Sequence, residues 1–563
     1  MRINKQVFKI FLTWFLFSYV AANAGTWNQT WFEERVDEYI NAGLNCHKNP
    51  GLSLAVVKDG KVVLTRGYGH KTLDKTDPVT ENTLFGIASL SKSFAATLML
   101  KQIEDNKTLS LSTTLRSLFG RGDLFKSILR SKYATIEDLL AHRIGLPSNN
   151  KLRFDDKLTR GNLIDRIKYL SVKGGFRTSF YYSNLMYGLI TRLSEILSGK
   201  TWEELVTEKL FSPLNMTSST FMTSADSKDL DLAAGYTEAK DDARLVPVPF
   251  EFNRRWGDLC GSGCILSNAV DMSKWMLFNL NQNKDSKYEK VLKSDTLADA
   301  HSLQNYISYS RASVYQKPTM PETLDDNNYG LGWRLGHYRG YPMVTHSGST
   351  FGYVSLLTML PNTNIGVYTA MSGKDSGYIL RTNLHTYIAD LALGLEPWMN
   401  RTTVCTFPEP WTNKTTKSSS KGPAKDIPAT RDLATYTGVF KNPAYGTIDV
   451  YKNQTSGLLM VKYGYAQFIL YPKSTPDQFY AEGFGLLENV VDYSTFDFGL
   501  DKNKTVSHLR VPSFETKDPP VFDRVNPSQS RLISSHNGGG TVWISEMLMV
   551  WTLGVVCKIV QTE

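Results

Sequence analysis

The stretch Phe85-Gly-Ile-Ala-Ser-Leu-Ser-Lys-Ser-Phe94 decides the fold. Within it Ser89 and Lys92 stand three residues apart, and apolar residues with helical spacing continue to about Glu104. A three-residue step in a helix puts both side chains on one face, where a lysine of lowered pKa can take the proton of a serine hydroxyl. Backbone N–H groups at a helix N-terminus also favour developing negative charge. The stretch therefore predicts a serine nucleophile, Ser89, with Lys92 handling its proton.

The S-x-x-K spacing alone is a weak signal. It recurs at Ser148/Lys151, in a predicted loop, and at Ser418/Lys421, in a predicted linker. A helix-capping serine beside a solvated lysine is the ordinary explanation of such a pair. The apolar helix that directly follows Ser89 favours the catalytic interpretation there.

Two further short motifs follow in order along the chain. The first is Tyr182-Ser183-Asn184, and the second is His346-Ser347-Gly348 followed by Ser349. Taken alone, the first motif is explained by a core tyrosine beside a polar turn. The second is explained by a surface histidine on an edge strand. Their order after Ser89 favours a common site.

Together the three motifs resemble those of the serine β-lactamase-related, penicillin-binding-protein-like superfamily, and in particular class C β-lactamases, esterases and D-aminopeptidases of the peptidase S12 type. The resemblance covers about residues 30–395 and includes the segments Leu139–Pro147, Gly263–Met272 and Tyr329–Trp333. It implies an α+β fold, in which helices flank an antiparallel sheet and a helical subdomain is added. Strand patterns at 52–58, 61–65, 353–360 and 365–370, with helical patterns between them, agree with terminal segments that share one sheet.

The resemblance also implies the roles of the site residues. Ser89, Lys92 and Tyr182 would be catalytic, with either Lys92 or Tyr182 as the base. The substrate-binding residues would be Asn184, His346, Gly348 and Ser349. The N–H groups of Ser89 and Ser349 would form an oxyanion hole. The substrate would be a small ester, amide or peptide, with no metal or organic cofactor.

His346 stands where β-lactamases carry a lysine. An imidazole with the reference pKa of ~6.5 is largely neutral near neutral pH. Esterase or D-amino-acid peptidase activity is therefore expected in preference to β-lactamase activity. The alternative is a non-catalytic extracellular protein that uses the fold as a scaffold, since the chain also resembles the gigasin-type shell-matrix proteins of molluscs. The chain lacks the acidic runs that usually indicate calcium binding.

The N-terminal residues 1–24 predict a cleaved signal peptide. A basic start precedes a short apolar stretch and Ala22-Asn23-Ala24, an A-x-A cleavage pattern. Secretion agrees with seven Asn-x-Ser/Thr sequons, which predict N-glycosylation. They are Asn28, Asn106, Asn215, Asn400, Asn413, Asn453 and Asn503.

Charge and cysteine content exclude some classes of function. The formal net charge is +9 over 563 residues, and Lys and Arg are scattered, so a nucleic-acid partner is not expected. Five cysteines suit an oxidising compartment without predicting a disulfide-built fold. Cys260 and Cys264 could pair with each other or with Cys46 or Cys405, and their spacing favours no zinc site.

Composition divides the chain after the catalytic region, residues 25–398. Residues 399–428 are rich in Ser, Thr, Lys and Pro and predict a linker. Seven short alternating runs within 429–525 predict a small β-barrel-like accessory domain. In the tail 526–563, residues 541–557 are apolar apart from Glu546, which suits a buried or interfacial segment as well as a membrane anchor.

Overall fold

A computed structural model describes residues 27–224, 227–240, 244–281, 284–308, 314–413, 424–490 and 494–525. The predicted signal peptide, the predicted tail and the Ser418/Lys421 pair lie outside these residues. Within them, no helix is both long and apolar enough to cross a membrane.

The central element is an eight-stranded antiparallel sheet in the order β2-β1-β13-β12-β11-β10-β9-β8. Its strands are β1 (Gly51–Lys58), β2 (Lys61–Gly69), β8 (Asn305–Tyr306), β9 (Leu324–Tyr329), β10 (Arg334–Tyr338), β11 (Tyr341–Thr350), β12 (Tyr353–Leu360) and β13 (Ile365–Ser372). The turn between β1 and β2 places Asp59 and Gly60 at positive φ, as a tight hairpin requires. β1 pairs with β13, with Leu52 opposite Met371, so the prediction that terminal segments share one sheet is confirmed.

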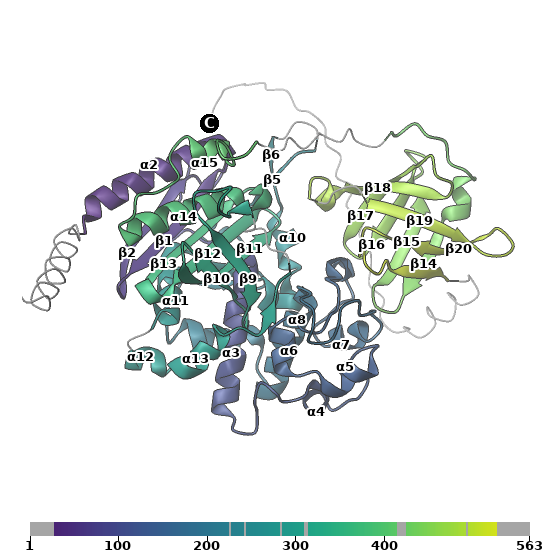
Figure 1. The fold of residues 1–563 in the computed structure, drawn as a ribbon. Helices are drawn as coiled ribbons and strands as arrows, with labels where there is room; N and C mark the ends of the chain where they lie inside the picture. The colour runs from purple at the N-terminus through teal and green to yellow at the C-terminus, as the bar shows by residue number, and fades with distance from the viewer. Residues whose placement is uncertain are drawn as a thin grey trace, which may run out of the picture. The chain divides into compact units, whose positions relative to one another are not determined.

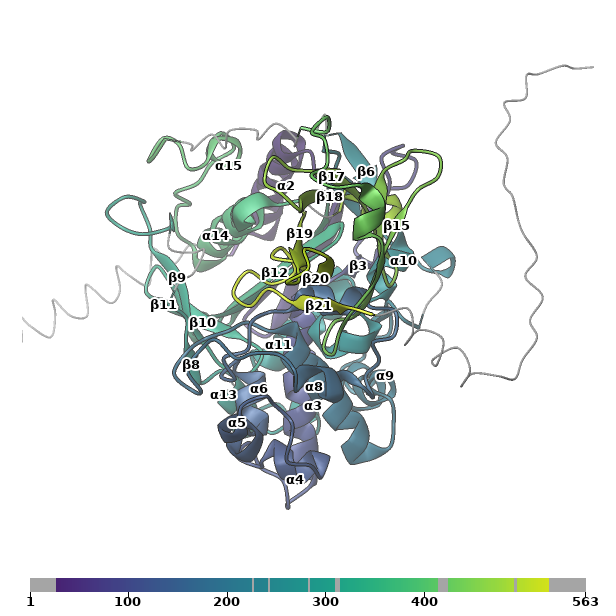
Figure 2. The same cartoon turned by 90° about the vertical axis from the view of Figure 1, so that its right-hand side faces the viewer.

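Helices cover both faces of this sheet (Figures 1 and 2). α2 (Gln29–His47) and α14 (Ile379–Leu393) pack on one face, and α3 (Ser91–Asp105) and α11 (Ala269–Asn279) pack on the other. β12 and β13 are consequently buried along their whole length, which explains why their sequences are apolar without strict alternation.

A helical region lies between β2 and the second half of the sheet. It contains α4 (Leu115–Phe119), α5 (Ile128–Tyr133), α6 (Ile136–Leu140), α7 (Leu163–Ile167), α8 (Asn184–Ser198), α9 (Trp202–Val206) and α10 (Phe250–Arg254), and α12 (Ser286–Glu289) and α13 (Ser294–Ala300) follow α11. Reciprocal capping boxes at Thr135 and Thr201 start α6 and α9. Short strands β3 (Phe85–Gly86), β4 (Thr220–Phe221) and β7 (Ile265–Ser267) form a second sheet, and β5 (Tyr236–Glu238) pairs with β6 (Leu245–Pro247).

The start of the predicted linker packs against the helices that precede it. α15 (Thr403–Thr406) follows residue 398, Val404 and Phe407 are buried in the core that α2 and α14 share, and Cys405 forms a disulfide with Cys46. Residues 399–413 therefore contain buried apolar side chains among the polar residues that suggested a linker.

The C-terminal region forms a closed antiparallel barrel, which confirms the predicted all-β fold of this region. Its strands are β14 (Gly438–Asn442), β15 (Gly446–Lys452), β16 (Leu459–Tyr463), β17 (Ala466–Pro472), β18 (Gln478–Phe484), β19 (Ser494–Leu500), β20 (Val506–Arg510) and β21 (Val521–Arg524). The first seven correspond to the predicted runs. The short β21 was not predicted, and it closes the barrel by pairing with β14.

Candidate active site

Ser89 lies in a sharp turn directly before α3. It belongs to a single turn of 3-10 helix, Ala88–Leu90, that runs into Ser91, the first residue of α3. Ala88 has φ of +48°, a left-handed conformation that a residue with a Cβ rarely adopts. Ala88 and Leu90 are buried while Ser89 is partly exposed, so the turn presents the hydroxyl alone.

The turn is seated directly on the central sheet. A Cβ on Gly348 would lie 2.3 Å from the carbonyl oxygen of Ile87, so only glycine allows β11 to approach the turn this closely. From β12, the Ser355 hydroxyl donates a 2.7 Å hydrogen bond to the same carbonyl. β11 and β12 thereby fix the backbone that carries Ser89.

Lys92 is completely buried beneath Ser89. Its Nζ lies 3.1 Å from the Ser89 Oγ, 2.7 Å from the Asn184 Oδ1 and 2.8 Å from the Ser262 carbonyl oxygen. A neutral amine has two N–H donors and one lone pair. With the donors used by Asn184 and Ser262, the lone pair faces the Ser89 hydroxyl. Burial lowers the pKa of Lys92 well below its usual value, which favours this neutral form.

Asn184 and Tyr182 lie at the start of α8. The Asn184 Nδ2 donates to the Asn150 Oδ1 at 3.0 Å, which fixes the amide with its oxygen toward Lys92. The Tyr182 hydroxyl is hydrogen-bonded to Ser89, and its ring centroid lies 4.7 Å from the Lys92 Nζ. Burial raises the pKa of Tyr182, so the phenol keeps its proton at neutral pH. Of the two candidate bases, the surroundings favour Lys92 as proton acceptor and Tyr182 as proton donor.

His346 is buried behind Tyr182 and does not line the exposed side of the site at Ser89. It is 2% exposed. Its Nδ1 donates to the Ser347 carbonyl at 2.8 Å, and its Nε2 accepts from the Tyr329 hydroxyl at 3.1 Å. Burial, together with the positive charge of Arg334, lowers the pKa of His346 well below its usual value. The imidazole is therefore neutral, and both of its nitrogens are bonded within the protein.

Ser349 lies where β11 has a free edge. Thr350 and Tyr353 close a two-residue hairpin, so the alternation of the antiparallel ladder directs the Ser349 N–H away from β12. β10 ends its pairing with β11 at Thr345, and no described strand covers that side beyond it. The buried Arg381 supports this edge, because its guanidinium bonds the Ser349 hydroxyl and the Gly348 carbonyl.

Sequence reasoning missed His142, which holds the segment that carries Tyr182. The His142 carbonyl accepts from the Tyr181 N–H at 3.3 Å, and its ring Nδ1 accepts from the Ser183 N–H at 3.2 Å. Its ring centroid lies 4.5 Å from that of Tyr182. His142 is fully buried at φ of +56°, and burial lowers its pKa well below its usual value. Its place in the Leu139–Pro147 segment was the only signal of a role.

The cysteines pair as Cys46–Cys405 and Cys260–Cys264. The second pair brackets Gly261-Ser262-Gly263, the loop whose Ser262 carbonyl bonds Lys92. Among the described residues, the only group of potential metal ligands is Glu203 with Cys260 and Cys264. Because both sulfurs are used in the disulfide, this group offers no thiolate to a metal.

A family model described as Beta-lactamase matches residues 36–385. The chain belongs to the beta-lactamase family. Gigasin-6 of Magallana gigas is 44% identical over 246 residues, which is 43% of this chain and 81% of that protein. The Unguisins hydrolase of Aspergillus campestris (strain IBT 28561) is 26% identical over 448 residues, 75% of this chain and 78% of the relative. This beta-lactamase family member thus has hydrolases among its relatives.

Solved structures support the same beta-lactamase fold. The octameric penicillin-binding protein homologue from Pyrococcus abyssi matches with a TM-score of 0.56 at 21% identity, over 87% of this chain and 99% of that one. A class C beta-lactamase matches with a TM-score of 0.50 at 19% identity, over 66% of this chain and 98% of that one.

Proposed function

We propose that the protein is a secreted serine hydrolase that cleaves an ester or amide through an acyl-enzyme on Ser89. The observation that carries the proposal is the Lys92 amine, 3.1 Å from the Ser89 hydroxyl and fixed by two acceptors on its other sides. Such an arrangement of nucleophile, base and orienting groups is the usual signature of nucleophilic catalysis.

Each step of the reaction uses a group of this site. The Ser89 Oγ attacks the substrate carbonyl while its proton passes to Lys92. The resulting oxyanion accepts hydrogen bonds from the N–H groups of Ser89 and Ser349. The tetrahedral intermediate then expels the alcohol or amine, which receives the proton through Lys92 or Tyr182. Water attacks the acyl-enzyme by the same route, releases the acid and restores the Ser89 hydroxyl.

The charge of the site favours neutral substrates. β-lactams carry a carboxylate, and a lysine in the third motif would bind it by a charge-assisted hydrogen bond of about 1.5–3 kcal/mol. His346 is neutral and bonded within the protein, so it supplies no such charge. Short neutral esters, amides or D-amino-acid peptides are therefore the proposed substrates. The name of the Unguisins hydrolase, and a structure of the fold neighbour SurE solved with D-Leu, support a peptide-like substrate class for this proposal.

We also propose secretion and N-glycosylation. Six of the seven sequon asparagines are exposed, and Asn453 is partly exposed, so oligosaccharides can be attached without unfolding the described structure. Asn400 and Asn413 both lie in the region that composition assigned to a linker. The proposed partners are the substrate and no nucleic acid; the role of the tail, including any membrane association, lies outside the described residues.

The central experiment replaces the nucleophile. Ser89→Ala should lower hydrolysis of a p-nitrophenyl ester at least about a thousandfold without changing the melting temperature, because the hydroxyl is removed and the turn is kept. Intact-mass spectrometry after treatment with a fluorophosphonate should show one adduct on the wild-type chain and none on this variant. Ser418→Ala, at the S-x-x-K serine of the predicted linker, is the matched control and should be labelled normally. Labelling that persists in Ser89→Ala would refute the assignment.

The 44% identity to Gigasin-6 favours one alternative, a non-catalytic extracellular matrix protein that keeps the fold as a scaffold. A folded, secreted protein that neither reacts with the fluorophosphonate nor hydrolyses any ester or D-amino-acid amide would support that alternative.

A further inference from the structure

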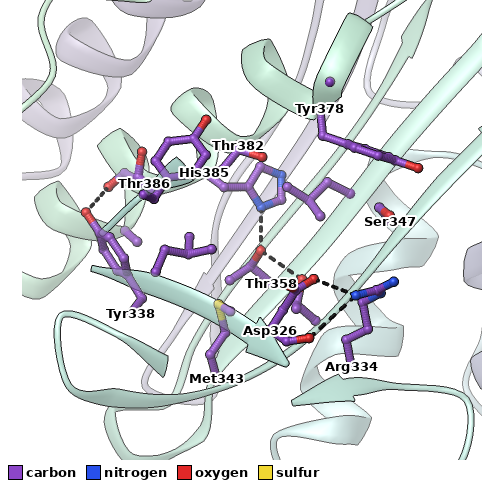
Figure 3. Close-up of a pocket in the computed structure, with 16 residues that line it drawn as sticks. Asp326, Arg334, Tyr338, Met343, Ser347, Thr358, Tyr378, Thr382, His385 and Thr386 are labelled. Atoms are coloured by element: carbon purple, nitrogen blue, oxygen red, sulfur yellow. Dashed lines mark hydrogen bonds and ion pairs between the residues drawn. The ribbon is translucent and has the colours of Figure 1, made fainter. Parts of the chain in front are cut away.

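A cavity of about 350 Å³ lies between the sheet and α14 (Figure 3). Small-molecule sites typically measure about 300–1,000 Å³, so this volume suits a ligand. Strands β9 to β12, helix α14 and the loop before it supply the lining, together with Tyr315. The lining residues used below are Leu324, Asp326, Arg334, Met343, Ser347, Leu356, Thr358, Tyr378, His385 and Ala389.

The cavity adjoins the candidate active site at the free edge of β11. Side chains alternate along a strand, so Ser347 faces the cavity while His346 faces Tyr182. Figure 3 shows Ser347 and Tyr378 beside each other at one end of the cavity. Tyr378 and Arg334 both lie close enough to Tyr182 to influence its pKa. A substrate that reacts with Ser89 at this edge can therefore extend past Ser347 into the cavity.

The lining carries no net charge. Its two charged groups pair with each other, with the Arg334 Nη1 3.1 Å from the Asp326 Oδ2. The pKa of His385 is lowered to about 3 by burial, and its ring bonds two threonine hydroxyls, one of them Thr358. A charged ligand would incur a large desolvation free energy in this cavity, because no unpaired opposite charge is present among the described residues of the lining. An uncharged ligand would not carry this cost.

The remainder of the wall combines uncharged hydroxyl-bearing side chains, among them Thr345, Thr382 and Thr386, with apolar groups. Leu324, Met343 and Leu356 come from the sheet, and Ala389 faces them from α14. Burial of a methylene against such a wall contributes about 0.8 kcal/mol, which corresponds to roughly a fourfold change in kcat/KM for each methylene.

We propose that this cavity binds an uncharged chain of the substrate, attached near the reacting carbonyl, and so sets the chain-length selectivity of the hydrolase. The proposal rests on the proposed function, because it assigns a second part of the same substrate. Ala389 and Met343 are specificity-determining residues in this view, since they lie on facing walls and do not touch the groups around Ser89.

The test compares chain length in two ester series, one with acyl chains of increasing length and one with alcohol chains of increasing length. In the wild type, kcat/KM should rise by roughly fourfold for each methylene in at least one series until the cavity is full. Ala389→Met should reduce kcat/KM for the longest esters at least about tenfold, whereas kcat/KM for acetate esters should stay unchanged. Ala392→Met, at a buried position of α14 that does not line the cavity, is the matched control and should leave both values unchanged.

A second variant and a binding measurement separate the two proposals. Met343→Ala should shift the preferred chain to greater length, and it keeps the test valid if Ala389→Met does not fold. Calorimetry with 1-octanol on the Ser89→Ala protein should show binding that Ala389→Met removes. Octanol binding without any ester hydrolysis would refute the proposed function and leave the cavity assignment standing. Absence of octanol binding, or identical chain-length profiles in all variants, would overturn the cavity assignment.

Discussion

His142 controls the position of Tyr182 through two bonds from one residue. Its carbonyl binds the N–H before Tyr182 and its Nδ1 binds the N–H after it. The Oδ1 of an asparagine occupies nearly the place of the Nδ1 of a histidine, and asparagine tolerates positive φ. An asparagine can thus replace the acceptor at this position without backbone strain.

We predict that His142→Asn keeps most of the activity whereas His142→Leu and His142→Gly lose it. Loss of the acceptor leaves the buried Ser183 N–H unpaired, which costs about 1–3 kcal/mol and corresponds to roughly a tenfold to hundredfold fall in kcat. KM should change little, because His142 lies behind Tyr182. Steady-state kinetics on ester substrates, with melting temperatures for each variant, measure both effects. Equal losses in all three variants would indicate a general packing role.

The two buried basic groups predict that the rate depends on pH whereas the substrate preference does not. Lys92 acts as a base only when neutral, so kcat should fall as the pH falls through its pKa, which burial lowers from the usual value. His346 is already neutral and its pKa is lowered as well, so the preference for neutral esters over penicillins should stay constant from about pH 8 to about pH 6. His346→Lys should narrow that preference at neutral pH. A preference that collapses near the ordinary imidazole pKa would contradict a buried, neutral His346.

At the scale of elements, the loop Gly261–Gly263 supplies one of the two acceptors that hold Lys92. The Cys260–Cys264 disulfide closes this loop, and both sulfur-bearing residues are fully buried. The disulfide therefore restrains the loop whose Ser262 carbonyl accepts a hydrogen bond from Lys92.

The double variant Cys260→Ser/Cys264→Ser should lower both stability and kcat. Closing a loop this short contributes about 2 kcal/mol in the chain-entropy model, and release of the loop also frees the Ser262 carbonyl from Lys92. Cys46→Ser/Cys405→Ser is the matched control. It removes the disulfide between α2 and α15 and should lower the melting temperature without a comparable loss of kcat. Unchanged kcat in the first double variant would show that the loop holds Lys92 without its disulfide.

The elements that carry Ser89 and Tyr182 could be predicted because short-range patterns specify them. A hydroxyl and an amine on one turn, and a tyrosine before a helix start, are visible in the chain. The groups that hold these side chains in place could not be predicted. Ser262 contributes only its backbone carbonyl, and Gly348 contributes only the space left by a missing Cβ. His142 accepts a hydrogen bond from Ser183, which is 41 residues away in the sequence. Such roles depend on long-range packing. β21 was missed for the same reason, since a four-residue strand is defined by its partners.

At the scale of the whole molecule, the barrel should fold as a domain of its own. Eight strands close on themselves, so no strand edge needs a partner from elsewhere. The disulfide and buried side chains of α15 protect the chain as far as Phe407.

Limited proteolysis should therefore cut first between Asn413 and Pro428 and release a stable C-terminal fragment that retains β-sheet circular dichroism. Mass spectrometry of the fragments locates the cut. The control is the same digestion after removal of N-linked glycans, which should accelerate cleavage at this segment without moving it. First cleavage inside the barrel, with no stable fragment, would count against two domains.

The pairing of β1 with β13 has a consequence for the order in which the chain is made. Leu52 and Met371, partners across the ladder, stand far apart in the sequence. During synthesis on the ribosome, β1 can pair with β2 early, but its other edge has no partner until β13 has been made. Contacts of such long sequence separation form slowly, and an uncovered edge invites association with other chains. Nascent chains that stop before Ile365 should consequently depend on chaperones, whereas those that extend past Ser372 can complete the sheet that supports the Ser89 turn.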